Sequence, residues 1–84
     1  MLNNQQREYL SEKLIEDNEI ANASDLQIKM IRDLVYDVNA LDLRHSVSHI
    51  FDVLSSDNNN HLLKRAAGLC LEALCIDQAS EASI

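Results

Sequence analysis

Apolar residues are most concentrated between residues 62 and 76, in the stretch LLKRAAGLCLEALCI. A helix turns by about 100° per residue, and at that spacing the apolar side chains of this stretch cover more than half of the helix circumference. A helix that is apolar over so wide an arc is contacted by neighbours on two or more sides. The pattern therefore predicts a helix over about residues 60–78 at the centre of the fold. The final residues, about 79–84, are expected to fray.

The first predicted helix spans about residues 4–18, and its apolar face is narrow and interrupted by charge. Its other side carries an acidic ridge in which glutamates recur every four residues, namely Glu8, Glu12 and Glu16. Like charges at that spacing destabilise a helix by roughly 0.2–0.5 kcal/mol per pair. The ridge is either an ordinary solvated surface or a surface that meets a basic partner, and the pattern leaves both interpretations open.

Ser24 predicts the start of a second helix, because it can cap the helix while Gln27, three residues later, completes a capping box. This helix spans about residues 25–39. One of its edges combines apolar and acidic side chains, namely Leu26, Met30, Asp33 and Asp37. Methionine adapts its shape to a partner and rim charges select that partner, so this edge is a candidate for the rim of a protein-binding groove. The alternative is that the first helix covers it.

The apolar pattern slips out of phase after residue 38 and restarts at Leu43. A continuous helix would place polar residues at core positions, so the slip predicts a break, with Asn39 or Asp42 as the cap of a third helix over about residues 42–56. The Ser-, Asp- and Asn-rich segment 55–60 then predicts a loop before the last helix. The sequence thus predicts an all-α fold, a small four-helix bundle that forms a single domain over residues 1–84.

Composition narrows the classes of partner. The 84 residues contain 7 Lys and Arg against 14 Asp and Glu, a net charge of −7. Nucleic acids and anionic membranes require clustered basic residues, so direct binding to either is not expected. The chain shows neither a membrane-spanning run of about 20 apolar residues nor a signal peptide, and a cytoplasmic location is expected. A nucleic-acid mimic or a helix-turn-helix regulator remains an alternative function.

The two cysteines, Cys70 and Cys75, lie five residues apart on the last predicted helix. Side chains at that spacing point about 140° apart, so the two thiols cannot form a disulfide with each other. The spacing also differs from that of paired zinc ligands. Both are therefore expected to be small buried hydrophobic residues in a reducing compartment.

His45 and His49 provide the one spacing that resembles a metal site. Residues four apart share a helix face, and Asp42 and Asp52 are near enough to complete a ligand set. This face lies opposite the apolar one and is open to water, so no metal site is predicted, and a metal- or pH-responsive regulator is kept as an alternative. The sequence contains no nucleophile motif and no phosphate-binding loop. A protein without catalytic activity or cofactor is expected.

Gly68, the single glycine, lies on the narrow polar side of the last helix. Glycine within a helix costs about 1 kcal/mol relative to alanine, but it allows another backbone to approach closely. Together with Leu63, Leu71 and Cys75 it forms a candidate dimer seam. The alternative is ordinary packing against another part of the same chain.

These features favour a small acidic helical protein-interaction module, of the adaptor, inhibitor or chaperone type, that binds another protein with a basic surface. Its expected contact residues are the acidic ridge of the first helix and the mixed edge of the second. The same module is expected to be capable of forming a homodimer through the seam at Gly68.

Overall fold

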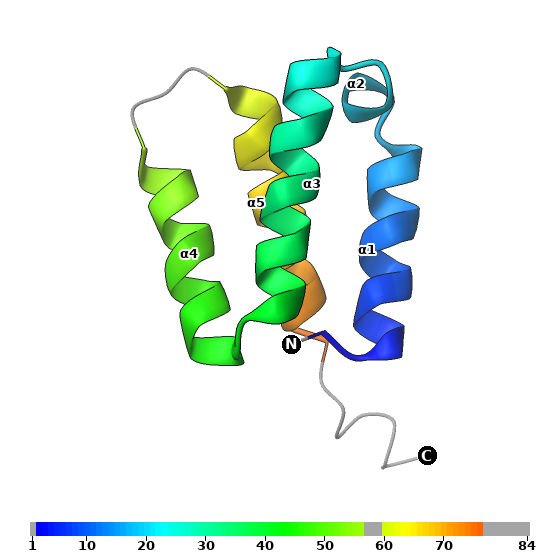
Figure 1. Cartoon of the computed structure of the whole chain (residues 1–84). Helices are drawn as coiled ribbons and strands as arrows, with labels where there is room; N and C mark the ends of the chain where they lie inside the picture. Colours follow the sequence, from blue (N-terminus) through cyan, green and yellow to red (C-terminus); the bar gives the residue numbers. More distant parts are fainter. Residues whose placement is uncertain (1, 57–59, 77–84) are drawn as a thin grey trace.

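The computed structural model describes residues 2–56 and 60–76, and within them all regular secondary structure is helical. Five helices follow in order: α1 (Asn4–Glu16), α2 (Asn18–Ala21), α3 (Asp25–Ala40), α4 (Leu43–Ser55) and α5 (His61–Leu74). The four longer helices alternate in direction along the chain (Figure 1). The all-α prediction is confirmed, whereas the number of helices differs from the predicted four. None of the described helices has the length and apolar composition needed to cross a bilayer.

The first predicted helix is divided at Asp17. This residue has an extended backbone (φ −80°, ψ 105°), and its carboxylate accepts hydrogen bonds from the backbone N–H groups of Glu19 (3.0 Å) and Ile20 (3.1 Å). It therefore acts as the N-cap of α2, because a short acidic side chain satisfies the unpaired N–H groups at a helix start. The new direction buries Ile20 in the core. The predicted helix over residues 4–18 thus ends at Glu16.

Side-chain caps also fix the other helix starts. The predicted capping box at Ser24 is present, with reciprocal 3.3 Å bonds to Gln27. Asp42 caps α4, as predicted, by accepting a hydrogen bond from the backbone N–H of His45 (2.9 Å). Helix α4 ends at Ser55 and α5 at Leu74, the latter four residues before its predicted end. The predicted fraying of residues 79–84 lies outside the described residues.

Helix α5 occupies the centre of the molecule, in agreement with the sequence. It packs against each of α1, α2, α3 and α4, and Figure 1 shows it behind α3 with α1 and α4 on either side. Small and aliphatic side chains allow this close packing, and its buried residues are Leu62, Leu63, Ala66, Ala67, Cys70 and Ala73. Burial on several sides is what its wide apolar arc requires.

Polar contacts fasten α1 to α5. The Tyr9 hydroxyl donates a hydrogen bond to the Glu72 carboxylate (3.1 Å), and this bond raises the pKa of Tyr9 above its ordinary value. The amide of Gln6 donates to the Ile76 carbonyl oxygen (3.1 Å). Just after α1, the Arg65 guanidinium pairs with Asp17 (3.2 Å). Helix α1 is therefore positioned by α5, and it shares few contacts with α3.

A candidate docking groove between α1 and α3

A groove lies between α1 and α3. The part near α2 has a volume of about 360 Å³ and is lined mainly by aliphatic side chains, namely Leu14, Ile15, Ile20, Ala21, Ile28 and Ile31, with Arg32 at the edge. The part near the start of α1 has a volume of about 160 Å³ and is lined by residues that include Leu10, Leu14, Val35, Tyr36 and Asn39. Leu14 lines both parts, so they adjoin along the length of the two helices.

The rims of this groove are also apolar. Ile15 on α1 is 77% exposed and Tyr36 on α3 is 72% exposed, while Leu10 and Ile31 beneath them are buried. Single apolar side chains on a surface are common, but apolar rims over an apolar groove are typical of sites for another protein. At the lower end, the side-chain oxygen of Asn39 is buried without a hydrogen-bond partner among the described residues.

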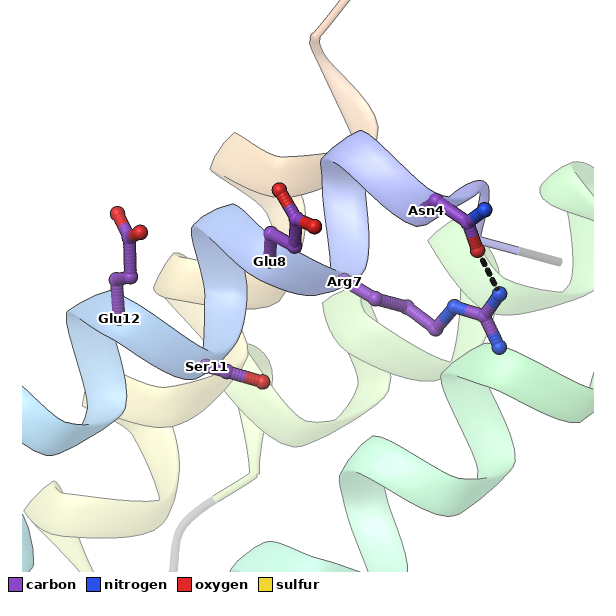
Figure 2. A pocket seen from close by; sticks show the side chains of 5 residues that line it. All are labelled: Asn4, Arg7, Glu8, Ser11 and Glu12. Carbon is purple, nitrogen blue, oxygen red and sulfur yellow. Dashed lines mark hydrogen bonds between the residues drawn. The ribbon is translucent and has the colours of Figure 1, made fainter.

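The outer side of α1 carries the predicted acidic ridge. Glu8, Glu12 and Glu16 are all exposed, and Figure 2 shows Glu8 and Glu12 projecting from the same side of the helix. Glu16 lies 3.6 Å from the Lys13 ammonium group, whereas no other described residue forms an ion pair with Glu8 or Glu12.

Glu8 and Glu12 border a surface hollow of about 400 Å³ together with Asn4, Arg7 and Ser11 (Figure 2). All five residues come from one helix, so the hollow is shallow, and Arg7 within it donates a hydrogen bond to Asn4. Arg7 and Ser11 also line the groove between α1 and α3. Glu8 and Glu12 line this hollow and neither part of the groove, so Arg7 and Ser11 lie between the acidic ridge and the groove.

The predicted mixed edge of α3 lies on the other side of that helix. Met30, Asp33 and Asp37 line a pocket of about 240 Å³ with residues of α4 and α5, whereas Leu26 is exposed outside it. The amide of Asn60 also donates to the Met30 sulfur (3.5 Å). The alternative interpretation, that the first helix covers this edge, is wrong, because α4 lies there.

His45 and His49 engage two different carboxylates. His45 Nδ1 lies 2.7 Å from Asp42, and His49 Nε2 lies 3.4 Å from Asp37 on α3. The backbone N–H of His45, followed by its ring, holds the pKa of Asp42 below its ordinary value. Among residues 2–56 and 60–76, no three His, Cys, Asp or Glu side chains come together in a way that could hold a metal ion.

The residues of the predicted seam at Gly68 occupy different environments. Leu63 belongs to the core, Gly68 and Leu71 are half-buried, and Cys75 is exposed. Outside its chain neighbours and the backbone of its own helical turns, a Cβ atom added to Gly68 would meet no described atom within 4 Å. The glycine therefore does not serve close packing within the described part of the chain, and the seam itself stays a prediction.

Both cysteines are free thiols. Cys70 is buried, as predicted, and this burial raises the pKa of its thiol to about 12. The prediction of a buried residue is wrong for Cys75, which is exposed. It follows the last residue of α5, on the side of that helix that faces away from the core.

The most exposed apolar residue of the groove, Ile15, was not predicted as a contact residue. Ile15 lies on the helix surface between the apolar line of Leu10 and Leu14 and the acidic ridge. An apolar residue at such a position is the feature of the sequence that could have identified it as a contact residue. Tyr36 carries a comparable signal, since it lies off the main apolar face of α3.

Comparisons of this chain with models of protein families, with curated proteins and with solved structures gave no match.

Proposed function

We propose that this protein is a protein-interaction module that docks an apolar helical surface of another protein chain in the groove between α1 and α3. The observation that carries the proposal is the pair of exposed apolar rims, Ile15 and Tyr36, on either side of a continuous apolar groove. The 13 residues of α1 span about 20 Å, the length of a three- to four-turn helix. Docking a helix by its apolar face into such a groove is a common mode of recognition.

Charge defines the partner further. The acidic ridge lies on the outer side of α1, beyond the groove residues Arg7 and Ser11, and Glu8 and Glu12 have no ion-pair partner among the described residues. Basic side chains on the docked helix would lie beside this ridge, so the partner is expected to carry Lys or Arg on that flank. Charges at the rim of an interface contribute mainly to selectivity and to the rate of association.

The chemistry of the groove supports binding rather than catalysis. Its ionisable side chains are the guanidiniums of Arg7 and Arg32 and the phenol of Tyr36. The guanidiniums stay protonated in proteins and so do not act as general acids or bases, and no carboxylate, imidazole or thiol lines the groove among the described residues. We place the module in the cytoplasm, since two free thiols suit a reducing compartment.

Affinity capture with three versions of the protein tests the proposal. Ile15→Glu introduces a charge into the groove, and Leu43→Glu introduces the same charge at a 60% exposed position on α4 as a matched control. Wild type and Leu43→Glu are expected to retain the same partner, and Ile15→Glu is expected to lose it. Retention by Ile15→Glu with loss by Leu43→Glu would contradict the proposed site.

A double substitution tests the contribution of the ridge. Reversing Glu12 and Glu16 to lysine is expected to weaken capture without a change in the circular dichroism spectrum, because both side chains are exposed. Unchanged capture would remove the ridge from the binding surface and leave the groove alone as the site.

A further inference from the structure

A second pocket lies between α3, α4 and α5, on the other side of α3 from the groove. Its volume is about 240 Å³, and its apolar lining comes from all three helices, namely Met30, Leu34, Val53 and Leu63. Sites for small molecules usually have volumes of about 300–1,000 Å³. A pocket of this size therefore fits one long side chain rather than a cofactor or a docked helix.

Two carboxylates also line this pocket. Asp33 and Asp37 lie one helical turn apart on α3, and like charges at that spacing destabilise a helix. Asp33 is exposed and takes part in no ion pair among the described residues. Asp37 lies 3.4 Å from His49 Nε2, and an imidazole carries a positive charge only when it is protonated. The negative charge at the pocket is therefore only partly compensated.

The basic side chains close to the two aspartates in sequence do not supply the missing positive charge. Lys29 lies one turn before Asp33, and Lys64 follows the pocket residue Leu63, but no described residue forms an ion pair with either lysine. Arg32 lines the groove on the other side of α3. The pocket thus combines an apolar lining with a negative charge that a cation from outside can compensate.

We infer that this pocket binds an arginine side chain exposed on the surface of a partner protein. The aliphatic stem of arginine covers apolar surface while its charged end stays in contact with water. Its planar guanidinium carries five N–H donors and can donate to both aspartates at once, whereas the ammonium group of lysine is a compact point charge. The inference goes beyond the proposed function and does not depend on it, because the pocket and the groove share no lining residue.

Met30 makes the pocket adaptable. Its side chain is 36% exposed, and its sulfur accepts a hydrogen bond from the amide of Asn60 (3.5 Å). An unbranched thioether adjusts its shape to the group that packs against it. The methyl group of Met30 therefore reports directly on whether an aliphatic stem enters the pocket.

An NMR titration of protein labelled with ¹³C in the methionine methyl groups tests the inference. The probe is Nα-acetyl-L-arginine N-methylamide, an arginine residue with both backbone ends capped. The Met30 methyl signal is expected to shift to saturation with a Kd in the millimolar range, because one side chain makes few contacts. The norleucine counterpart has an aliphatic stem without charge and is expected to bind about tenfold more weakly.

Substitution of the aspartates tests the role of their charge. Asp33→Asn and Asp37→Asn are each expected to weaken binding of the arginine probe about twofold to fivefold, and the double variant about tenfold, as partly exposed ion pairs would. Glu8→Gln on α1 removes the same charge outside the pocket and is the matched control. It is expected to leave the Kd unchanged. Circular dichroism spectra of all variants are expected to match the wild type.

Three results would overturn the inference: no saturable shift of the Met30 methyl signal, equal binding of the norleucine probe, or unchanged binding in the double variant. A Met30 shift that follows protein concentration without any probe would also overturn it, because a second copy of the chain would then be the occupant. Ile15→Glu is expected to bind the arginine probe as the wild type does, so the pocket and the docking groove can each fail without the other.

Discussion

Gly68→Ala is expected to stabilise the protein. Gly68 lies within α5, it has no positive φ angle, and an added methyl group would meet no described atom within 4 Å. The substitution therefore gains helix propensity without a steric cost, and the free energy of unfolding is expected to rise by about 1 kcal/mol. With an unfolding entropy of about 2.1 cal/mol/K per residue, this gain corresponds to about 6 °C in Tm for 84 residues.

Urea and thermal unfolding followed by circular dichroism at 222 nm would measure the effect, with an unchanged m-value as the sign that the denatured state is unaltered. Gly68→Ser is expected to give about half of the gain, because serine is intermediate in helix propensity. Unchanged or lower stability in Gly68→Ala would refute the reasoning. It would indicate that another backbone packs on Gly68, as the predicted seam requires, and the stability of the wild type would then rise with protein concentration.

Three further substitutions or reactions test the core and the caps. Cys75 is exposed and is expected to react with a thiol reagent in the native protein, whereas Cys70 is expected to react only on unfolding. The pKa of Cys70, about 12, leaves about one thiolate in 10⁴ at pH 8. Mass spectrometry of samples taken at successive times would distinguish the two thiols. Ser46→Ala removes the buried hydroxyl that donates to the Val38 carbonyl oxygen (2.9 Å) and is expected to lower the unfolding free energy by about 1–2 kcal/mol in urea titrations. Asp42→Asn is expected to have a lower free energy of unfolding than the wild type at neutral pH and the same free energy of unfolding in strong acid. The pKa of Asp42 is lowered in the native state from 3.8, so its stabilisation is present above that value and is lost as pH falls through the native pKa.

Contrary results would each identify an error. Rapid native labelling of Cys70 would mean that the core around α5 opens readily. An unchanged free energy of unfolding in Ser46→Ala would mean that the connection between α3 and α4 does not depend on the buried hydrogen bond. If the free energies of unfolding of Asp42→Asn and the wild type differed by the same amount across the acid range, the ionised carboxylate would be excluded as the source of the stabilisation.

The elements that the sequence predicted correctly depend on residues that are close together in the chain. The capping box at Ser24 and the cap at Asp42 involve residues three apart, and the wide apolar arc of α5 is a property of one continuous stretch. The break at Asp17 was missed because the apolar line of the first helix continues through it. The break also depends on a residue far away in the sequence, because Arg65 on α5 forms an ion pair with Asp17.

The groove could not be predicted in the same way. It exists because α1 is held by α5 through contacts 63 and 70 residues apart in sequence, Tyr9 with Glu72 and Gln6 with Ile76. Nothing in the local pattern states which two of several helices pack tightly and which leave a gap. The acidic ridge was predicted to lie on the surface, and its three glutamates are exposed. Its position relative to the groove depends on how α1 packs against α5.

The proposed docking of another chain in the groove between α1 and α3 can be observed directly in solution. Two-dimensional ¹H–¹⁵N NMR spectra of the wild type, recorded with and without the partner recovered by affinity capture, test this docking residue by residue. Shifts on addition of the partner are expected along both helices around Ile15, Arg32 and Tyr36. Shifts confined to α4 and the outer side of α5, around Leu43 and Gly68, would contradict the claim.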